Sequence, residues 1–281
     1  MKLLRYGPAG AERPGLLDDV GRIRDLSAII PDISGKSLSR AGLNALRRLD
    51  PAALPLVADA VRLGPCVAGV GNFIAVGLNY ADHARESGLP IPDEPVLFNK
   101  APSSIAGPND PILIPPGSSK LDWEVEIAMV IGETAYDIPE SDAPDVIAGY
   151  CVCHDVSERS FQNERGGQWT KGKSSPGFGP LGPWLVTADE IADVQDLALR
   201  LDVNGARMQA GSTATMIFGL HFLVSYVSRF MRLEPGDVIT TGTPPGVGMG
   251  QRPPRYLKAG DSVELGIAGL GTQRQQVLAH G

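Results

Sequence analysis

The residues best suited to chemistry are carboxylates beside apolar stretches. Glu124 and Glu126 occupy alternate positions in DWEVEIAMVIG, whose apolar run indicates a strand entering the core. Alternate residues of a strand face the same side, so both carboxylates should point together. Two poorly solvated carboxylates repel each other, and a hard divalent cation would relieve that repulsion. An exposed edge strand with two solvated glutamates explains this pair equally well, so the motif alone leaves both interpretations open.

A third carboxylate, Asp155, favours the metal site. It follows the apolar run Val146–Cys153 within the segment CHDVSER. Three carboxylates suit Mg²⁺ or Mn²⁺, with water or substrate in the remaining positions, whereas zinc prefers Cys and His. The neighbouring His154 would face the opposite side of a strand, so we expect it to be structural.

A second candidate is the pair His83 and Glu86 in the segment NYADHARE. On a short helix, residues three apart share a face, and a carboxylate beside an imidazole makes it a better base. The pair could therefore activate a water molecule. Taken alone, an incidental His–Glu pair on a surface helix is the better explanation.

The glycine-rich stretch from residue 166 to 180, GGQWTKGKSSPGFGP, is a third candidate. It is long for a loop without a function, and Lys171 or Lys173 could place an ammonium group over an anionic substrate. The Gly-x-Gly pieces elsewhere lack the spacing of a dinucleotide fingerprint, and no phosphate-binding P-loop is present. These pieces are therefore interpreted as turns.

The elements that must position these residues are mostly short strands. We expect helices at Tyr80–Ser87 and Thr215–Arg232, and a helical pattern at Arg40–Arg48 ends at Asp50-Pro51. The expected strands are Phe73–Gly77, Pro95–Asn99, Ile112–Ile114, Val125–Ile131, Leu199–Val203, Val238–Thr241 and Ser262–Ile267. Many strands with few helices argue against a doubly wound parallel sheet. Residues 1–70 are interpreted as a small accessory domain and residues 71–281 as the larger domain.

Composition narrows the function classes. The chain has 281 residues, 43% hydrophobic and 20% charged, which is typical of an ordinary folded protein. A formal net charge of -7 argues against nucleic acid as a partner. No run suits a membrane span or secretory signal, and three sparse cysteines fit the reducing cytoplasm. Cys151 and Cys153 alternate with Val152 and are interpreted as small strand residues rather than ligands.

Taken together, the motifs from about residue 70 to the end resemble the fumarylacetoacetate hydrolase family. The pieces that carry the resemblance are GLNYADHARE, EPVLFNKAPSSIAGPNDPI, DWEVEIAMVIG, AGYCVCHDVSERSFQ, GQWTKGK, GPLGPWLVTADEI, MIFGLHFLVSYVSRFMRLEPGDVITTGTPPGVG and LKAGDSVELGIAGLG. They occur in the family's order. The resemblance implies an α+β fold, a mixed β-sheet roll with a small N-terminal domain, and commonly a homodimer.

The resemblance also implies roles for particular residues. Metal carboxylates of the family match Glu124, Glu126 and Asp155. The water-activating pair matches His83 and Glu86, and the pocket lysine matches Lys173. The matching substrate contacts are Arg159, Gln162 and Thr243. Some members add a fourth carboxylate where this chain has Val76, so we expect a water molecule there.

One departure from the family's usual sequence bears on the substrate. Many relatives carry Asp-Thr where this chain has Pro176-Gly177. The N-terminal sequence and the GGQW segment are most similar to a branch of sugar-acid diketo hydrolases, often labelled ureidoglycolate lyases. The resemblance therefore implies cleavage of a C–C bond in a 2,4-dioxo acid, with a 2,4-diketo-3-deoxy sugar acid as the leading substrate. Oxaloacetate decarboxylation, ureidoglycolate cleavage and 2-oxo acid isomerisation remain open, and a binding protein without turnover is disfavoured by the His–Glu pair.

Overall fold

The computed structural model describes residues 1–58, 60–86 and 90–280, without the side chains of His83 and Ala84. Within these ranges, ten strands form one large mixed sheet in the order β3-β2-β1-β12-β10-β9-β15-β4-β5, with β6 also paired to β12. Their bounds are β1 Lys2–Tyr6, β2 Arg13–Leu17, β3 Ile23–Asp25, β4 Phe73–Gly77, β5 Val96–Lys100, β6 Ile105–Ala106, β9 Val125–Ile131, β10 Ile147–His154, β12 Gly179–Thr187 and β15 Val238–Thr240.

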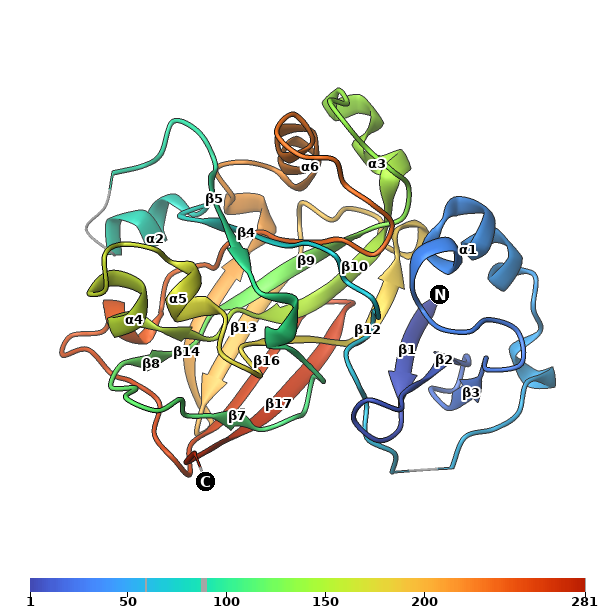
Figure 1. Cartoon of the computed structure of the whole chain (residues 1–281), viewed down its shortest axis with the longest axis horizontal. Coiled ribbons are helices and arrows are strands. Elements are labelled where there is room, and N and C mark those ends of the chain that lie inside the picture. Colours follow the sequence, from blue (N-terminus) through green and yellow to red (C-terminus); the bar gives the residue numbers. More distant parts are fainter. Residues whose placement is uncertain (59, 87–89, 281) are drawn as a thin grey trace.

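A second sheet packs against the large one and completes the roll (Figure 1). Its order is β14-β13-β16-β17-β7, and the short pair β11-β8 stands apart. The bounds are β7 Ile112–Leu113, β8 Leu121–Asp122, β11 Ser157–Glu158, β13 Ala198–Val203, β14 Ala206–Ser212, β16 Ser262–Ile267 and β17 Gly271–Leu278. The helices are α1 Arg40–Arg47, α2 Ala81–Glu86, α3 Ala143–Val146, α4 Arg159–Asn163, α5 Thr170–Lys173 and α6 Leu220–Ser228.

The central strand β9 explains why the core has two parts. Ile127 and Met129 belong to the cluster between the two sheets, whereas Ala128 and Val130 belong to the cluster on the opposite face of the large sheet. This division follows the two-residue alternation of a strand. Because both faces are covered, every residue of β9 is buried. Glu126 shares its face with Ala128 and Val130, so it points away from the interior of the roll.

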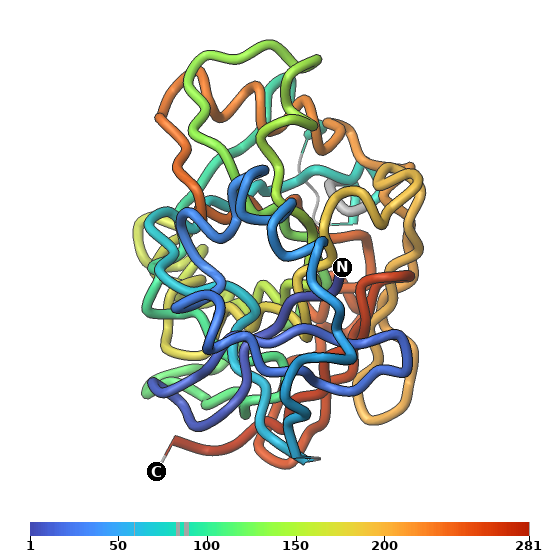
Figure 2. Tube along the Cα trace, turned by 90° about the vertical axis from the view of Figure 1, so that its right-hand side faces the viewer, coloured from blue at the N-terminus to red at the C-terminus, as the bar shows by residue number. Residues whose placement is uncertain are grey.

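The N-terminal segment joins the large sheet directly. Strand β1 pairs antiparallel with β12, with Lys2 opposite Val186 and Leu3 opposite Leu185. Leu3, Leu26 and Leu38 pack in the same cluster as Ala128 and Val130 of β9. This blue segment lies on the right-hand side of Figure 1 and faces the viewer in Figure 2. The N-terminal part therefore covers one end of a sheet face whose other end carries Glu126.

Most expected elements are present, but one helix is shorter than predicted. Strands β4, β9 and β16 have the predicted bounds, whereas the helix expected at Thr215–Arg232 is confined to α6. The backbone N–H of Ile217 and Phe218 bonds to the carbonyl and side chain of Asn79, at 2.8 Å each. These contacts hold residues before Gly219 out of a helix. In the described part of the chain, the helices are too short or too polar to cross a bilayer.

Candidate metal and active site

Two neighbouring strands bring the three predicted metal carboxylates together. Strands β9 and β10 are antiparallel, with Glu126 opposite Cys153. The start of β9 therefore lies beside the end of β10, and the N–H of Asp155 donates to the carbonyl of Glu124 at 3.0 Å. One carboxylate oxygen from each of Glu124, Glu126 and Asp155 lies within 4.8 Å of the others, and all three residues are buried.

Two lysines meet Asp155 from opposite sides. Lys173 at the end of α5 donates to Glu124 Oε2 at 2.7 Å and to Asp155 Oδ2 at 2.6 Å. Lys100 at the end of β5 donates to Asp155 Oδ1 at 2.6 Å and to the carbonyl of Lys173 at 2.5 Å. Burial lowers the pKa of Lys173, but the charges of Asp155 and Glu124 outweigh it and leave that pKa raised. Lys173 is therefore held as an ammonium group, and Lys100 is fixed by its hydrogen bonds to Asp155 and to the Lys173 carbonyl.

Arg159 joins two carboxylates, Glu124 and Asp122. Its Nη2 donates to Glu124 Oε1 at 2.5 Å and its Nε to Asp122 Oδ2 at 2.8 Å. Asp122 also accepts the backbone N–H of Gly248 at 2.6 Å and of Met249 at 3.0 Å. Asp122 thus joins Arg159 to the turn that follows Thr243, and charge-assisted bonds of this kind hold a guanidinium in one orientation.

Glu126 has a different environment from its neighbours. Its Oε2 accepts the Thr240 hydroxyl and, at 2.9 Å, the N–H of Gly242. Burial raises the pKa of Glu126, and the negative charges of Asp155 and Glu124 raise it further. Two neutral donors replace only part of the lost hydration of a carboxylate. Ionisation of Glu126 is therefore unfavourable in this environment.

The charge balance of this group fits a divalent cation. We call Asp122, Glu124, Glu126 and Asp155 the acidic cluster. In the described part of the chain, its four carboxylates face three cations, which are Arg159, Lys173 and Lys100. The excess negative charge falls at Glu126. The oxygen-only donor set of Glu124, Glu126 and Asp155 suits Mg²⁺ or Mn²⁺, so the residues present fit such an ion.

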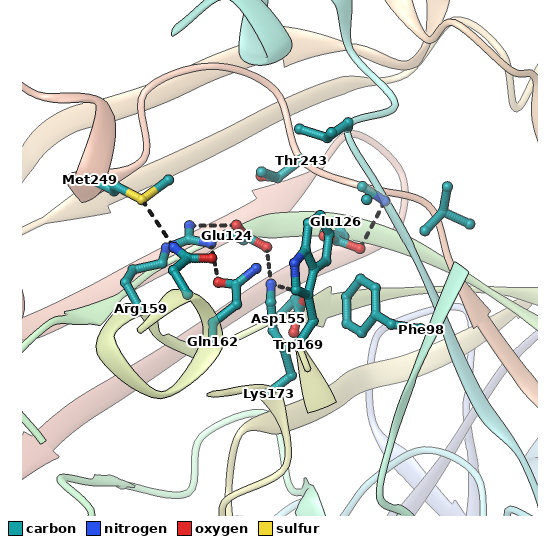
Figure 3. Close-up of a pocket in the computed structure, with 15 residues that line it drawn as sticks. Phe98, Glu124, Glu126, Asp155, Arg159, Gln162, Trp169, Lys173, Thr243 and Met249 are labelled. Carbon is teal, nitrogen blue, oxygen red and sulfur yellow. Dashed lines mark hydrogen bonds and ion pairs between the residues drawn. The ribbon is translucent and has the colours of Figure 1, made fainter. Parts of the chain in front are cut away.

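Glu124, Glu126 and Asp155 form the floor of a cavity of about 210 Å³ (Figure 3). Its polar and charged lining residues are Glu124, Glu126, Asp155, Arg159, Gln162, Asn163, Lys173 and Thr243. Val76, Leu78, Phe98, Trp169 and Met249 supply the apolar lining, with Gly77 and Gly242 between them. The cavity therefore has a charged floor and an apolar wall, which suits a small anionic ligand.

The predicted substrate contacts lie around this cavity. Gln162 accepts a hydrogen bond from Arg159 Nη1 at 3.0 Å, so the two side chains act as one unit. The Thr243 hydroxyl donates to the carbonyl of Val125 and accepts from Gln209 Nε2, each at 2.8 Å. Each nitrogen of Arg159 and the hydroxyl of Thr243 are thus bonded within the protein, and both residues line the cavity together with Gln162.

The predicted base pair is described only in part. His83 lies in α2, but its side chain is outside the described residues. Both carboxylate oxygens of Glu86 accept the N–H of Gly246 at 3.0 Å. A Cβ on Gly250 would lie 2.4 Å from the Glu86 carboxyl carbon. Helix α2 therefore packs closely on the turn that carries Met249 into the cavity.

Sequence reasoning missed two charged residues of the site. Lys100 is fully buried against Asp155, and Asp122 is fully buried against Arg159. Asp122 could have been found, since it continues the two-residue alternation that joins Glu124 and Glu126. Lys100 ends a strand-like apolar run, but nothing in that run indicates a partner 55 residues away.

The departure at Pro176-Gly177 lies beside the cavity lining rather than in it. Pro176 is exposed and Gly177 has a φ of +83°, which favours glycine. The N–H of Phe178 donates to the carbonyl of Ser175 at 3.0 Å and closes a turn over both residues. Val76 does line the cavity, and its isopropyl group offers no ligand to a cation.

The chain is similar to known proteins over its whole length. Residues 72–278 match the family model described as fumarylacetoacetate (FAA) hydrolase C-terminal. A Burkholderia ambifaria protein named provisionally as a hydrolase is 62% identical over 276 residues, covering 98% of both chains. A fumarylacetoacetate hydrolase from Exiguobacterium antarcticum has a TM-score of 0.84 at 38% identity, covering 100% of both chains.

A further solved structure contains ligands. The maleylpyruvate hydrolase from Sphingobium sp. SYK-6, in complex with manganese(II) and pyruvate, has a TM-score of 0.82 at 26% identity and covers 100% of both chains. The family model and these full-length similarities agree with the mixed-sheet fold and with the buried carboxylates described above. The chain belongs to the fumarylacetoacetate hydrolase family.

Proposed function

We propose that this protein is a metal-dependent hydrolase that cleaves a C–C bond in a small 2,4-dioxo acid, releasing pyruvate and a second acid. The observation that carries the proposal is the buried group of Glu124, Glu126 and Asp155 at the floor of a small cavity. Its excess negative charge favours a divalent cation, and the flanking Lys173 and Arg159 favour an anionic substrate.

We assign different side chains to the two ends of the substrate. A bound Mg²⁺ or Mn²⁺ would supply Lewis acidity to a 2-oxo acid and fix its position. Arg159 and Gln162 lie where they can donate to the substrate carboxylate, and we assign the loop at Thr243 to the same end. Lys173 presents an ammonium group that can stabilise negative charge developing on the released fragment.

Hydrolysis also needs a base for water. We assign this role to His83, with Glu86 orienting the imidazole, from their three-residue spacing in α2. Glu86 is anchored to the N–H of Gly246, so α2 is held beside the turn that lines the cavity. The pair would take a proton from water as that water attacks the distal carbonyl.

The related maleylpyruvate hydrolase supports the ligand assignment, since its structure contains manganese(II) and pyruvate. We extend both to this chain as cofactor and product. We further propose that residues 1–70 are an accessory domain, that residues 71–281 are the catalytic domain, and that the enzyme is a cytoplasmic homodimer.

The direct test is an activity panel with purified protein and Mg²⁺ or Mn²⁺. Acylpyruvates, diketo sugar acids, oxaloacetate and ureidoglycolate should be compared, with pyruvate release as the readout. We expect turnover of at least one 2,4-dioxo acid and none after chelation by EDTA. Turnover of oxaloacetate or ureidoglycolate alone would reassign the reaction, and turnover that resists EDTA would contradict the metal-dependent mechanism.

A further inference from the structure

One side of the cavity, next to the charged floor, is apolar and contains two aromatic rings. Phe98 on β5 and Trp169 before α5 meet edge to face, with ring centroids 5.3 Å apart at 64°. Val76 and Leu78 are further apolar lining residues, and we call these four side chains the aromatic wall. Met249 lies across the cavity from the two rings, beside Arg159 (Figure 3). The floor and the wall thus offer different chemistry to the two ends of one ligand.

The indole of Trp169 is held in place from two sides. A Cβ on Gly77 would lie 2.2 Å from Trp169 Cζ3, so the ring lies directly on the end of β4 where glycine leaves room. The next residue, Thr170, donates its hydroxyl to the carbonyl of Asn99 at 2.6 Å, which ties the chain to β5. The ring is therefore a fixed surface of the cavity.

The aromatic wall also touches the catalytic end of the site. The ammonium nitrogen of Lys173 lies 5.2 Å from the centroid of Phe98, within cation–π range. One ring thus contacts both Trp169 and the lysine that binds Glu124 and Asp155. The floor and the aromatic wall therefore meet at Phe98, and a ligand seated on the floor can extend along this wall.

Hydroxyl groups would find few partners on the wall. Of its side chains, only the indole N–H of Trp169 is a strong donor, and the amide of nearby Asn163 is directed to the sulfur of Met249 at 3.7 Å. A hydroxyl desolvated without a partner weakens binding, whereas a methylene or planar unsaturated group gains contact with aromatic faces.

We propose that Trp169 and Phe98 select 2-oxo acids whose distal part is apolar or planar and unsaturated, and that polyhydroxylated sugar acids are poor ligands. This inference rests on the proposed function, because it assumes that the 2-oxo acid end occupies the metal floor. It replaces the sugar-acid substrate implied by resemblance to one branch with a short acylpyruvate bearing an apolar or unsaturated acyl chain.

The test uses probes that differ by one hydroxyl and cannot be hydrolysed as 2,4-dioxo acids. Binding of 2-oxopentanoate and 4-hydroxy-2-oxopentanoate to the full chain with Mg²⁺ is measured by calorimetry, with oxalate as a probe of the floor alone. We expect 2-oxopentanoate to bind at least about ten-fold more tightly than its hydroxylated partner. Trp169→Gln should remove that preference and leave the Kd of oxalate unchanged.

Two further variants separate the wall from general folding. Gly77→Ala should displace the indole and reduce the preference, whereas Phe230→Leu, at a side chain 62% exposed, should leave it unchanged. Equal affinity of wild type for the two probes, or an unchanged preference in Trp169→Gln, would overturn the inference. If oxalate still bound in that case, the proposed metal site would stand. Failure of oxalate to bind in the presence of Mg²⁺ would overturn the proposed function and this inference together.

Discussion

Glu126 and Glu12 are both shielded glutamates, yet their pKa values move in opposite directions. Burial opposes ionisation of Glu12, but hydrogen bonds from Arg62 and the backbone, together with the charges of Arg5 and Arg62, outweigh it and lower the pKa. Arg62 donates to Glu12 at 2.9 Å and forms two bonds to Asp110, at 2.7 and 2.6 Å. Among the described residues, Glu126 accepts only from neutral donors, and its pKa is raised by burial and by neighbouring carboxylates.

The difference separates a network built for stability from one built for binding. Around Arg62, each carboxylate has a guanidinium partner, and the contacts join the N-terminal segment to the loop at Asp110. Around Glu126, the protein leaves a carboxylate without a cation of its own among the described side chains. Uncompensated charge of this kind is typical of functional sites, where stability is given up for affinity.

The largest effect should come from Asp155→Asn. This change removes a ligand from the metal group and leaves Lys100 and Lys173 facing a neutral amide. Breaking a buried ion pair in this way typically costs about 3–5 kcal/mol. We expect loss of turnover and a lower free energy of unfolding, measured by urea denaturation. The control Asp110→Asn, in the Arg62 network, should lose stability and keep turnover, and active Asp155→Asn protein would remove Asp155 from the site.

His83→Ala should affect rate rather than stability. Loss of a positioned general base typically lowers the rate by about 10²–10⁴-fold. Because we assign the 2-oxo acid end to the metal floor, the variant should keep the wild-type affinity for oxalate. Steady-state kinetics and oxalate calorimetry together check this expectation. Hydrolysis near the wild-type rate would exclude His83 as the base, and a parallel loss of oxalate binding would indicate a structural role.

Glu12→Gln should show the opposite pattern, with lower stability and unchanged kcat. Removing one partner of a shielded charged hydrogen bond typically costs about 1–3 kcal/mol. The folded pKa of Glu12 lies below its ordinary value of 4.5, so its contribution is present above that pH and is lost as pH falls through the folded value. The stability gap between wild type and variant should therefore narrow below pH 4.5. A gap that widens there would contradict the pairing with Arg62.

The smallest effect should be a gain in stability. Glu126→Gln removes a buried charge whose pKa is raised, so the metal-free protein should melt at a higher temperature than wild type. A gain of 1 kcal/mol corresponds to roughly 2–4 °C in a protein of about this size. Calorimetric melting in EDTA checks this, and a lower Tm for the variant would show that ionised Glu126 stabilises the metal-free fold.

Part of the site could be predicted because its residues obey local rules. Two-residue alternation placed Glu124 beside Glu126, and the end of an apolar run located Asp155 near them. Lys100 could not be predicted, because its partners are 55 and 73 residues away along the chain. The aromatic wall depends on Gly77 meeting Trp169, a contact that no local pattern encodes.

Prediction of the fold was likewise limited by contacts between residues distant along the chain. Strands such as β9, buried on both faces, are evident as continuous apolar runs, and β9 has its predicted bounds. The helix predicted from Thr215 was too long because its apolar spacing continues through residues that bond to Asn79 instead. Tertiary hydrogen bonds overrode a helical pattern there, since Asn79 lies 139 residues from Phe218.

The central claim is that Glu124, Glu126 and Asp155 hold a divalent cation. Its most direct test is titration of Mn²⁺ into the metal-free protein by isothermal calorimetry, with Glu126→Gln and Glu12→Gln in parallel. We predict one ion per chain for wild type and Glu12→Gln, and strongly weakened binding for Glu126→Gln. Metal at 100 times its Kd should also raise wild-type stability by about 2.7 kcal/mol. No Mn²⁺ binding to wild type, or equal binding to Glu126→Gln, would contradict the account.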